Sequence, residues 1–211
     1  LELIMNKTIG RTQKLKTQYR MDKSIMAFSN SQFYKNELEA HPSVKEHGFK
    51  SDGFMPVEFI DTAGCGYNET FSKSGKSLRN EKEAELIKER LGELSQYIDG
   101  LSLGIISPYR GQVNYLKDSL PEFENNINTI DAFQGQERDV IIVSLVRSND
   151  ELIIGFLKDY RRMNVAMTRA RKKLILIGDS ATVGADRFFS EFLDFVEKSG
   201  SYRTAWEYPS F

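Results

Sequence analysis

The sequence predicts an α/β fold in which helices cover both faces of a mostly parallel central sheet. Hydrophobic runs bounded by turn residues alternate along the chain with segments of helical periodicity, and this alternation is typical of such sheets. Several of the runs are apolar throughout, as strands buried on both faces require. The length of 211 residues, with 40% hydrophobic and 28% charged residues, fits one globular domain rather than a disordered or fibrous chain.

The strands are predicted where short apolar runs lie between turn residues. They cover residues 13–17, 55–61, 103–107, 128–131, 140–146 and 174–178. The helices are predicted at 23–34, 81–98, 111–120, 160–171 and 187–197. The helix at 81–98 has the strongest signal, because its apolar residues recur at spacings of three and four. Asn80 is expected to cap its first turn, with Glu83 at the capping-box position.

The composition excludes several classes of protein. The longest strongly apolar stretch, 140–146, is far shorter than the ~18 to 20 residues that cross a bilayer, so no membrane partner is expected. Cys65 is the only cysteine, and the two histidines lack metal-ligand spacing, so we expect neither a disulfide framework nor a metal site. A reducing, intracellular compartment such as the cytoplasm fits best. The chain begins at Leu1 without a signal pattern, so we interpret it as part of a longer protein.

Charge is balanced overall but uneven along the chain. The formal net charge is −1, yet seven basic residues and one acid, Asp159, lie between Lys158 and Lys173. A solvated charge run is the alternative to a binding function for this segment. The sequence at 74–77, SGKS, resembles the end of a phosphate-binding loop, but that motif requires a glycine where Thr70 stands. We therefore predict a surface loop at 64–76 and no phosphate cradle.

Two segments place an aromatic ring near a cation at the end of a predicted strand. In 15–21, Tyr19 could stack on a base and Arg20 could reach a phosphate at the carboxyl edge of a sheet; a purely structural pair is the alternative. In 104–112, Ser107 and the free amides of the helix start suit a backbone phosphate, and Pro108 and Tyr109 offer flat faces. An ordinary strand-to-helix turn with proline at N1 would explain the second segment equally well.

Two further segments are unusually polar. In 129–139, Gly135 allows close backbone approach, Glu137 could accept hydrogen bonds from ribose hydroxyls, and Gln134 could bridge two ligands. In 159–171, helical spacing would put Arg162 and Arg169 on one face. Another face would carry Arg161, Asn164, Thr168 and Arg171. An arginine placed at a transferring γ-phosphoryl group is worth on the order of 10³ to 10⁵ in rate.

Together these four segments resemble the second RecA-like motor domain of superfamily 1 helicases, in the Upf-like branch. QYRM at 18–21 is similar to the family's motif between the two motor lobes, and SPYRGQ at 107–112 to its motif IV. Residues 129–148 are similar to motif V and residues 161–179 to motif VI. The resemblance covers about 15–179. It implies a RecA-like three-layer sandwich, with 1–211 forming one C-terminal lobe and 180–211 a helix and tail packing on it.

The resemblance also implies roles for individual residues. The tyrosine that matches Tyr19 stacks on adenine, and the arginines that match Arg20 and Arg169 are catalytic and contact the γ-phosphate. Gly135 and Glu137 fall where the family binds ribose and senses hydrolysis. The residues that fall on the nucleic-acid-binding side are Ser107, Pro108, Tyr109, Thr129 and Asp131. Gln134 would lie between the nucleotide site and the nucleic-acid site.

The resemblance implies an ATP-dependent helicase or translocase, of which this chain is only part. ATP and Mg²⁺ would be held mainly by an N-terminal lobe that carries the phosphate-binding loop, and the isolated chain should be inactive as an ATPase. The expected partners are single-stranded DNA or RNA and that N-terminal lobe. The alternative is a non-catalytic nucleic-acid-binding or scaffold module that keeps the fold. A nuclease fused to a helicase remnant is a third possibility, although no clustered nuclease-type Asp/Glu/Lys set is evident.

Overall fold

Six parallel strands form the centre of the fold. The computed structural model describes residues 15–48, 55–73, 75–95, 97, 100–199 and 201–208. The strands are β3 (Val57–Asp61), β6 (Leu103–Ser107), β7 (Ile127–Thr129), β8 (Arg138–Ser144), β9 (Ala170–Gly178) and β10 (Tyr202–Thr204). They are ordered β10-β3-β9-β8-β6-β7, and every neighbouring pair is parallel.

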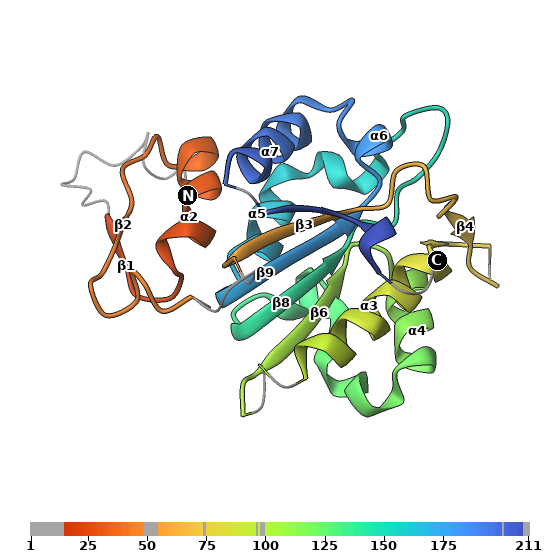
Figure 1. The fold of residues 1–211 in the computed structure, drawn as a ribbon, viewed down its shortest axis with the longest axis horizontal. Helices are drawn as coiled ribbons and strands as arrows, with labels where there is room; N and C mark the ends of the chain where they lie inside the picture. The colour runs from red at the N-terminus through yellow and green to blue at the C-terminus, as the bar shows by residue number, and fades with distance from the viewer. Residues whose placement is uncertain are drawn as a thin grey trace, which may run out of the picture.

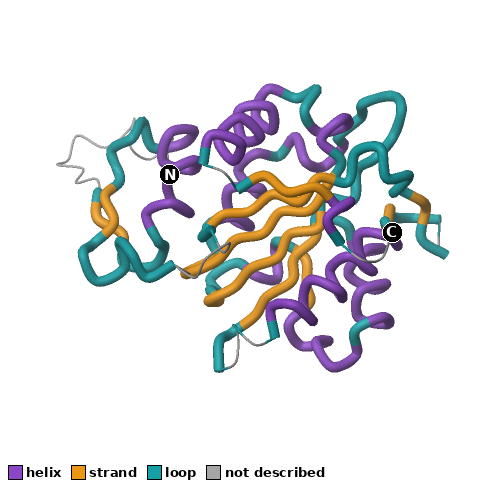
Figure 2. Tube along the Cα trace, viewed as in Figure 1, coloured by secondary structure: helices purple, strands orange, loops and turns teal. Residues whose placement is uncertain are grey.

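Helices cover both faces of this sheet (Figures 1 and 2). On one face lie α2 (Lys23–Phe33), α5 (Tyr160–Met167), α6 (Ser180–Val183) and α7 (Arg187–Lys198), and on the other lie α3 (Glu81–Leu94) and α4 (Arg110–Ser119). Alternate strand residues enter the two cores: Leu174 and Leu176 pack with α2, α5 and α7, whereas Ile175 and Ile177 pack with α3 and α4. The predicted three-layer α/β fold is confirmed.

A small substructure lies at the end of the central sheet where β8 and β9 begin (Figure 1). It consists of α2 and a two-stranded parallel sheet of β1 (Thr17–Gln18) and β2 (Glu39–Ala40). The amide of Asp22 donates to the Arg171 carbonyl at 2.9 Å, and His47 Nε2 lies 2.7 Å from the same oxygen. These contacts attach the substructure to β9. The predicted strand at 13–17 therefore lies outside the central sheet, and residues 13–14 lie outside the described residues.

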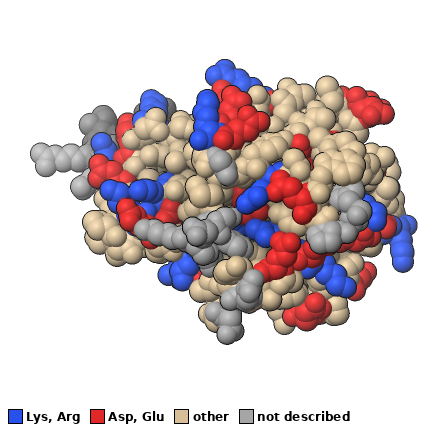
Figure 3. Space-filling model, viewed as in Figure 1, with Lys and Arg blue, Asp and Glu red and all other residues tan. Residues whose placement is uncertain are grey.

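A β-hairpin lies at the opposite end of the strands, beside α4 (Figure 1). It pairs β4 (Thr70–Phe71) with β5 (Leu78–Arg79), so the predicted surface loop at 64–76 runs into a short ordered ribbon. Short 3-10 helices, η1 (Pro121–Asn126), η2 (Asp131–Phe133), η3 (Gly155–Lys158) and η4 (Ala205–Glu207), occupy connections. Over the face shown in Figure 3, basic and acidic side chains are interspersed.

The structure corrects the predicted helix at 160–171. α5 ends at Met167, because the Thr168 hydroxyl donates back to the Asn164 carbonyl at 2.7 Å and β9 already begins at Ala170. Arg169 consequently lies in a turn and Arg171 in a strand. The prediction that Arg162 and Arg169 share a helix face was therefore wrong, and so was the placing of Arg171 on a helix.

The N-terminus of α3 confirms one prediction and corrects another. Asn80 caps the helix by accepting a hydrogen bond from the Glu83 amide at 3.1 Å. The Glu83 side chain does not complete a capping box, because it turns into the core toward Ser144 and Val146, while the Asn80 amide donates to Gln112 Oε1 at 2.8 Å. α3 ends at Leu94, short of the predicted end at residue 98, which lies outside the described residues.

Candidate nucleotide and nucleic-acid sites

Arg20, Glu137 and Arg169 meet at the end of the sheet where β8 and β9 begin. Arg20 Nε lies 2.5 Å from Glu137 Oε2, and Arg20 Nη1 donates to the Thr168 carbonyl at 3.3 Å. Arg169 donates from Nε to the Val165 carbonyl at 3.0 Å and from Nη1 to the Gln136 carbonyl at 3.2 Å. Three segments far apart in sequence thus bring two guanidinium groups and one carboxylate to a single edge. This is the amino edge of the central sheet, not the carboxyl edge that the sequence suggested for Tyr19 and Arg20.

The charges at this edge favour an anionic ligand. Arg20 and Arg169 both line a pocket of about 270 Å³ beside α2. Burial lowers the pKa of Arg169, and the nearby positive charge of Arg20 lowers it further. Among the described residues, no carboxylate forms an ion pair with Arg169, whereas Arg171 lies 3.8 Å from Glu137. A phosphate group between Arg20 and Arg169 would relieve the repulsion between them.

A compact turn presents Tyr19 and Arg20 to the pocket edge. Gln18 Oε1 accepts hydrogen bonds from the amides of Arg20 (2.8 Å) and Met21 (2.7 Å), and Gln18 Nε2 donates to the Met21 carbonyl at 2.7 Å. The Tyr19 side chain is 65% exposed and stacks on His41, with ring centroids 4.3 Å apart. Sequence reasoning missed both supporting residues. Gln18 lies within the QYRM motif, but no local sequence signal singles out His41.

The turn before β8 contains Gly135 and Glu137, the remaining residues predicted to bind the nucleotide. Gly135 has a φ of +84°, a left-handed conformation that favours glycine. The neighbouring Gln134 and Glu137 are exposed. Gln134 therefore lies between Glu137 and Asp131. Asp131 pairs with Arg162, which lines a second site at the other end of the strands.

The second site is a groove of about 960 Å³ at the other end of the strands, between the β4–β5 hairpin and α4. Pro108, Tyr109 and Arg162 are among its lining residues. Arg162 forms a bidentate pair with Asp131, at 3.2 Å from Nε to Oδ1 and 2.7 Å from Nη2 to Oδ2. The pairing of Arg162 with Asp131 separates this arginine from the Arg20–Arg169 edge.

Several predicted strand-binding residues are buried. Ser107 is fully buried, and its hydroxyl accepts a hydrogen bond from the Tyr109 amide at 3.3 Å. Tyr109 is 3% exposed, and its hydroxyl donates to the Ile154 carbonyl at 3.4 Å and lies 3.4 Å from Arg147 Nη1. The Tyr109 ring therefore does not offer the free flat face that the sequence suggested. Thr129, at the end of β7, is half-buried beside Ser107.

The described residues contain neither a cluster of metal-ligand side chains nor a helix that could span a membrane. They contain no group of three or more His, Cys, Asp or Glu side chains that could hold a metal ion. The arginines at the β8–β9 edge could hold phosphate oxygens, but this part of the chain has no carboxylate cluster that fits Mg²⁺. No helix within the described ranges combines the length and apolar character needed to cross a membrane.

The fold and the two sites define a RecA-like α/β domain, and comparison with known proteins gives its family. Residues 1–181 match a family described as an AAA domain. Relatives include DNA-binding protein SMUBP-2 from Mesocricetus auratus (36% identical, covering 94% of this chain and 21% of the relative) and an uncharacterized ATP-dependent helicase from Methanocaldococcus jannaschii (37%, 87% and 29%). DNA polymerase alpha-associated DNA helicase A from Saccharomyces cerevisiae is 34% identical, covering 90% of this chain and 31% of the relative.

The chain belongs to the superfamily 1 helicases, as a RecA-like domain. It spans about a fifth to a third of the length of these relatives. A solved structure, the C-terminal domain of a possible DNA helicase from Lactobacillus plantarum, is 13% identical to this chain and has a TM-score of 0.49. The match covers 89% of this chain and 98% of that one, but the likeness is too slight to support a conclusion.

Proposed function

We propose that this chain is the C-terminal motor lobe of an ATP-dependent helicase or translocase. The observation that carries the proposal is the convergence of Arg20 and Arg169, from distant segments, on one pocket at the start of β8 and β9. Arg20 already pairs with Glu137, but Arg169 forms no ion pair with a carboxylate of the described residues, so the two guanidinium groups together suit a further anion, and a triphosphate is the anion that these motors bind. ATP and Mg²⁺ would be held mainly by an N-terminal lobe on the other side of a cleft.

Each residue at this edge then has a part in the ATP site. The exposed Tyr19 ring is free on one side to stack on adenine, since His41 occupies its other side. Glu137, after the Gly135 turn, would accept hydrogen bonds from ribose hydroxyls. Arg20 and Arg169 contact the γ-phosphate and stabilise the charge that develops on it during hydrolysis.

The groove at the opposite end of the strands is the proposed path of a single strand of DNA or RNA. Pro108 and Tyr109 line this groove, and the buried Ser107 and the half-buried Thr129 would support it from the ends of β6 and β7. Asp131 would act through Arg162, whose guanidinium it orients in the groove. The 130–137 segment, including Gln134, connects the two sites and would transmit lobe closure on ATP to the strand.

The test is ATP hydrolysis and strand binding by the full-length protein. Arg169→Ala should lower ATP turnover at least 10³-fold while nucleotide-free binding of an oligo(dT) probe survives. Arg171→Ala is the matched control, because this half-exposed arginine lies two residues away and should change turnover only a few-fold. Equal loss of turnover and strand binding in Arg169→Ala would show that this arginine is structural or strand-binding instead.

The isolated chain provides a second test of the same proposal. The 211 residues alone should hydrolyse no ATP, because their sequence lacks the phosphate-binding-loop motif that would position the triphosphate. Robust turnover by the purified chain would contradict the two-lobe arrangement. A full-length protein that binds single strands without hydrolysing ATP would instead support the non-catalytic module.

A further inference from the structure

The walls of the groove are fixed to each other by close contacts. The amide of Gly111, in the first turn of α4, donates to Ser77 Oγ at 2.9 Å. A Cβ at position 111 would lie 2.6 Å from the Leu78 carbonyl oxygen, so only glycine lets the hairpin backbone approach this closely. Arg79 of β5 lies over the Tyr115 ring of α4 at 5.2 Å. The groove between the hairpin and α4 is therefore a built feature of the lobe.

Three cations in the groove are not committed to carboxylates. Arg79 pairs with Glu81 at 2.5 Å, and Arg162 pairs with Asp131 as described above. Lys73, Lys76 and Arg110 also line the groove, and none of them forms an ion pair with a carboxylate of the described residues. Their charges are available to a polyanion, and phosphate contacts are the main source of affinity in nucleic-acid binding.

An exposed aromatic ring lies at the same groove. Phe156 is 64% exposed, and its ring centroid lies 5.7 Å from that of the buried Tyr109. The preceding Gly155 has a φ of +55°, and a Cβ there would lie 2.4 Å from Arg147 Nη1. The backbone of this segment is therefore packed directly on the Arg147–Tyr109 contact.

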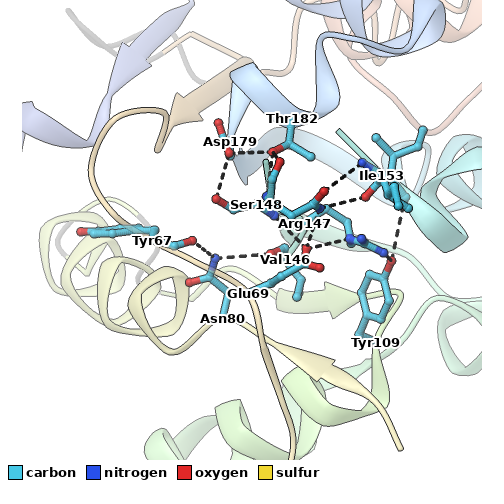
Figure 4. A network of polar contacts seen from close by, with 12 residues as sticks. Tyr67, Glu69, Asn80, Tyr109, Val146, Arg147, Ser148, Ile153, Asp179 and Thr182 are labelled. Atoms are coloured by element: carbon cyan, nitrogen blue, oxygen red, sulfur yellow. Dashed lines mark hydrogen bonds and ion pairs between the residues drawn. The ribbon is translucent and has the colours of Figure 1, made fainter. Parts of the chain in front are cut away.

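Hydrogen bonds, some buried and some exposed, hold the loop that leads to Phe156, and Figure 4 shows Glu69, Tyr109, Arg147 and Ile153 within this network. Arg147 Nε donates to Glu69 at 2.7 Å, which anchors the guanidinium beneath Gly155. Asn149 closes the loop, since its Oδ1 accepts from the Ile153 amide at 3.0 Å and its Nδ2 donates to the Ile153 carbonyl at 3.0 Å. A large apolar ring held toward solvent by this much structure indicates a contact surface.

We infer that Phe156 is a base-stacking platform for a single strand whose phosphates contact Lys73, Lys76 and Arg110. The inference deepens the proposed function and rests on it. A ring flanked by uncommitted cations suits single-stranded nucleic acid, because a base has an exposed face to stack and the backbone supplies charge. A duplex hides its base faces. No sequence pattern assigned strand binding to these four residues, because Tyr109, which is buried here, was the predicted stacking residue.

The stacking contact is tested by fluorescence anisotropy on the full-length protein with labelled oligo(dT) and oligo(rU). Phe156→Ala should weaken binding roughly tenfold, and Phe156→Trp should restore it. Ile153→Ala, which trims another exposed apolar side chain of the same loop, is the matched control and should have no effect. With an abasic oligonucleotide, wild type and Phe156→Ala should bind equally, because no base remains to stack.

The phosphate contacts are tested by the salt dependence of the same binding. Arg110→Gln should weaken binding and reduce the slope of log affinity against log salt by about 0.7, the value for one lost phosphate contact with a single strand. Lys117→Gln, on the last turn of the same helix, should leave the slope unchanged. Comparison of the two labelled probes separates a DNA preference from an RNA preference.

The outcomes separate this inference from the proposed function. If Phe156→Ala and Arg110→Gln bind single strands as tightly as the wild type, the inference about Phe156 is wrong, but the proposed motor-lobe function stands. Loss of ATP turnover in Phe156→Ala at unchanged strand affinity would assign the ring to a contact within the protein and also overturn the inference. Failure of the wild-type protein to bind any single strand would contradict the proposed function itself.

Discussion

Arg20 Nε lies 2.5 Å from Glu137 Oε2, although 117 residues separate them in the sequence. Arg20 follows β1 in the small substructure, and Glu137 precedes β8 of the central sheet. Their side chains are 34% and 42% exposed, and an exposed ion pair typically contributes only about 0 to 1 kcal/mol to folding. The ion pair therefore serves mainly to orient the two side chains. It joins Glu137, the proposed ribose-binding residue, to Arg20, a proposed γ-phosphate-binding residue.

Glu137→Ala should impair recognition of the ribose more than folding. In the full-length protein we expect ATP turnover to fall about tenfold, since Arg20 loses the carboxylate that orients it, and the unfolding midpoint to change little. The wild-type protein should favour ATP over 3′-deoxy-ATP, and the variant should treat them alike, because the acceptor for the hydroxyl is gone. The measurement is kcat/KM for both nucleotides.

The control for this prediction is Glu124→Ala, which removes an exposed carboxylate from η1. It should leave both turnover and the ATP preference unchanged. If Glu137→Ala still distinguishes ATP from 3′-deoxy-ATP as well as the wild type does, Glu137 does not bind the ribose.

Gln18→Ala should disturb the presentation of Tyr19 and Arg20. The variant loses three hydrogen bonds. Gln18 Oε1 no longer accepts from the Arg20 and Met21 amides, and Gln18 Nε2 no longer donates to the Met21 carbonyl. We expect a rise in KM for ATP of several-fold and a loss of about 1 kcal/mol in unfolding free energy. Gln18→Glu keeps the two accepting bonds and should show a smaller loss of stability. Unchanged kinetics in Gln18→Ala would mean that the turn holds its shape without this side chain.

The sequence predicted most of the central sheet, because its long strands carry strong apolar runs. β6 was predicted with its observed bounds, and β3 within two residues. β1, β2, β4, β5 and β10 have only two or three residues each, so they show no periodicity of their own. The positions of β1, β2 and β10 depend on pairing with distant segments, such as Tyr202 with Phe59, which no local pattern encodes.

The candidate sites were predictable only in part, because they too depend on contacts between segments that are distant in the sequence. Arg20 and Arg169 could be paired from motif resemblance, although their joint pocket depends on the end of α5 at Met167. The sequence did not indicate that Tyr109 is buried and Phe156 exposed, because contacts with distant segments decide which of the two rings reaches the surface. Tyr109 is buried beneath Arg147, whose position is set by Glu69, 78 residues earlier.

Lys173→Met should destabilise the fold strongly. Lys173 is fully buried on β9 and lies 2.7 Å from Glu58 Oε2, and Arg90 Nη2 contacts both Glu58 oxygens at 3.0 Å. These cations lower the pKa of Glu58 against the opposing effect of burial. Removing one of them leaves a poorly compensated buried carboxylate, at a cost of about 3 kcal/mol measured by urea unfolding.

Lys172→Met is the adjacent control for that variant. Lys172 is partly exposed and lies 3.4 Å from Asp139, so its loss should cost less than about 1 kcal/mol. The double variant Lys173→Met, Glu58→Gln should recover much of the stability, because it removes the Glu58 charge together with that of Lys173, while Arg90 keeps its ion pair with Glu93. A double variant no more stable than Lys173→Met alone would assign the loss to packing instead.

Glu83 should make the stability of the domain depend on pH. It is fully buried, with Ser144 Oγ 2.5 Å from its Oε2 and the Val146 amide donating to it at 3.0 Å. Burial raises the pKa of Glu83 from 4.5 to about 8. The folded state therefore retains a proton that the unfolded state releases. The stabilising effect is complete below pH 4.5 and is lost as the pH rises toward 8, by an amount on the order of a few kcal/mol.

Glu83→Gln isolates this effect, because the amide is neutral at every pH and can still form a hydrogen bond with the Ser144 hydroxyl and accept one from the Val146 amide. Urea unfolding between pH 5 and pH 8 should show wild-type stability falling relative to the variant as the pH rises. Glu85→Gln, which removes an exposed carboxylate from the same helix, should follow the wild type because Glu85 remains solvated in both states. Parallel curves for the wild type and Glu83→Gln would mean that Glu83 is already ionised in the folded protein, held by its contacts with Ser144 and Val146.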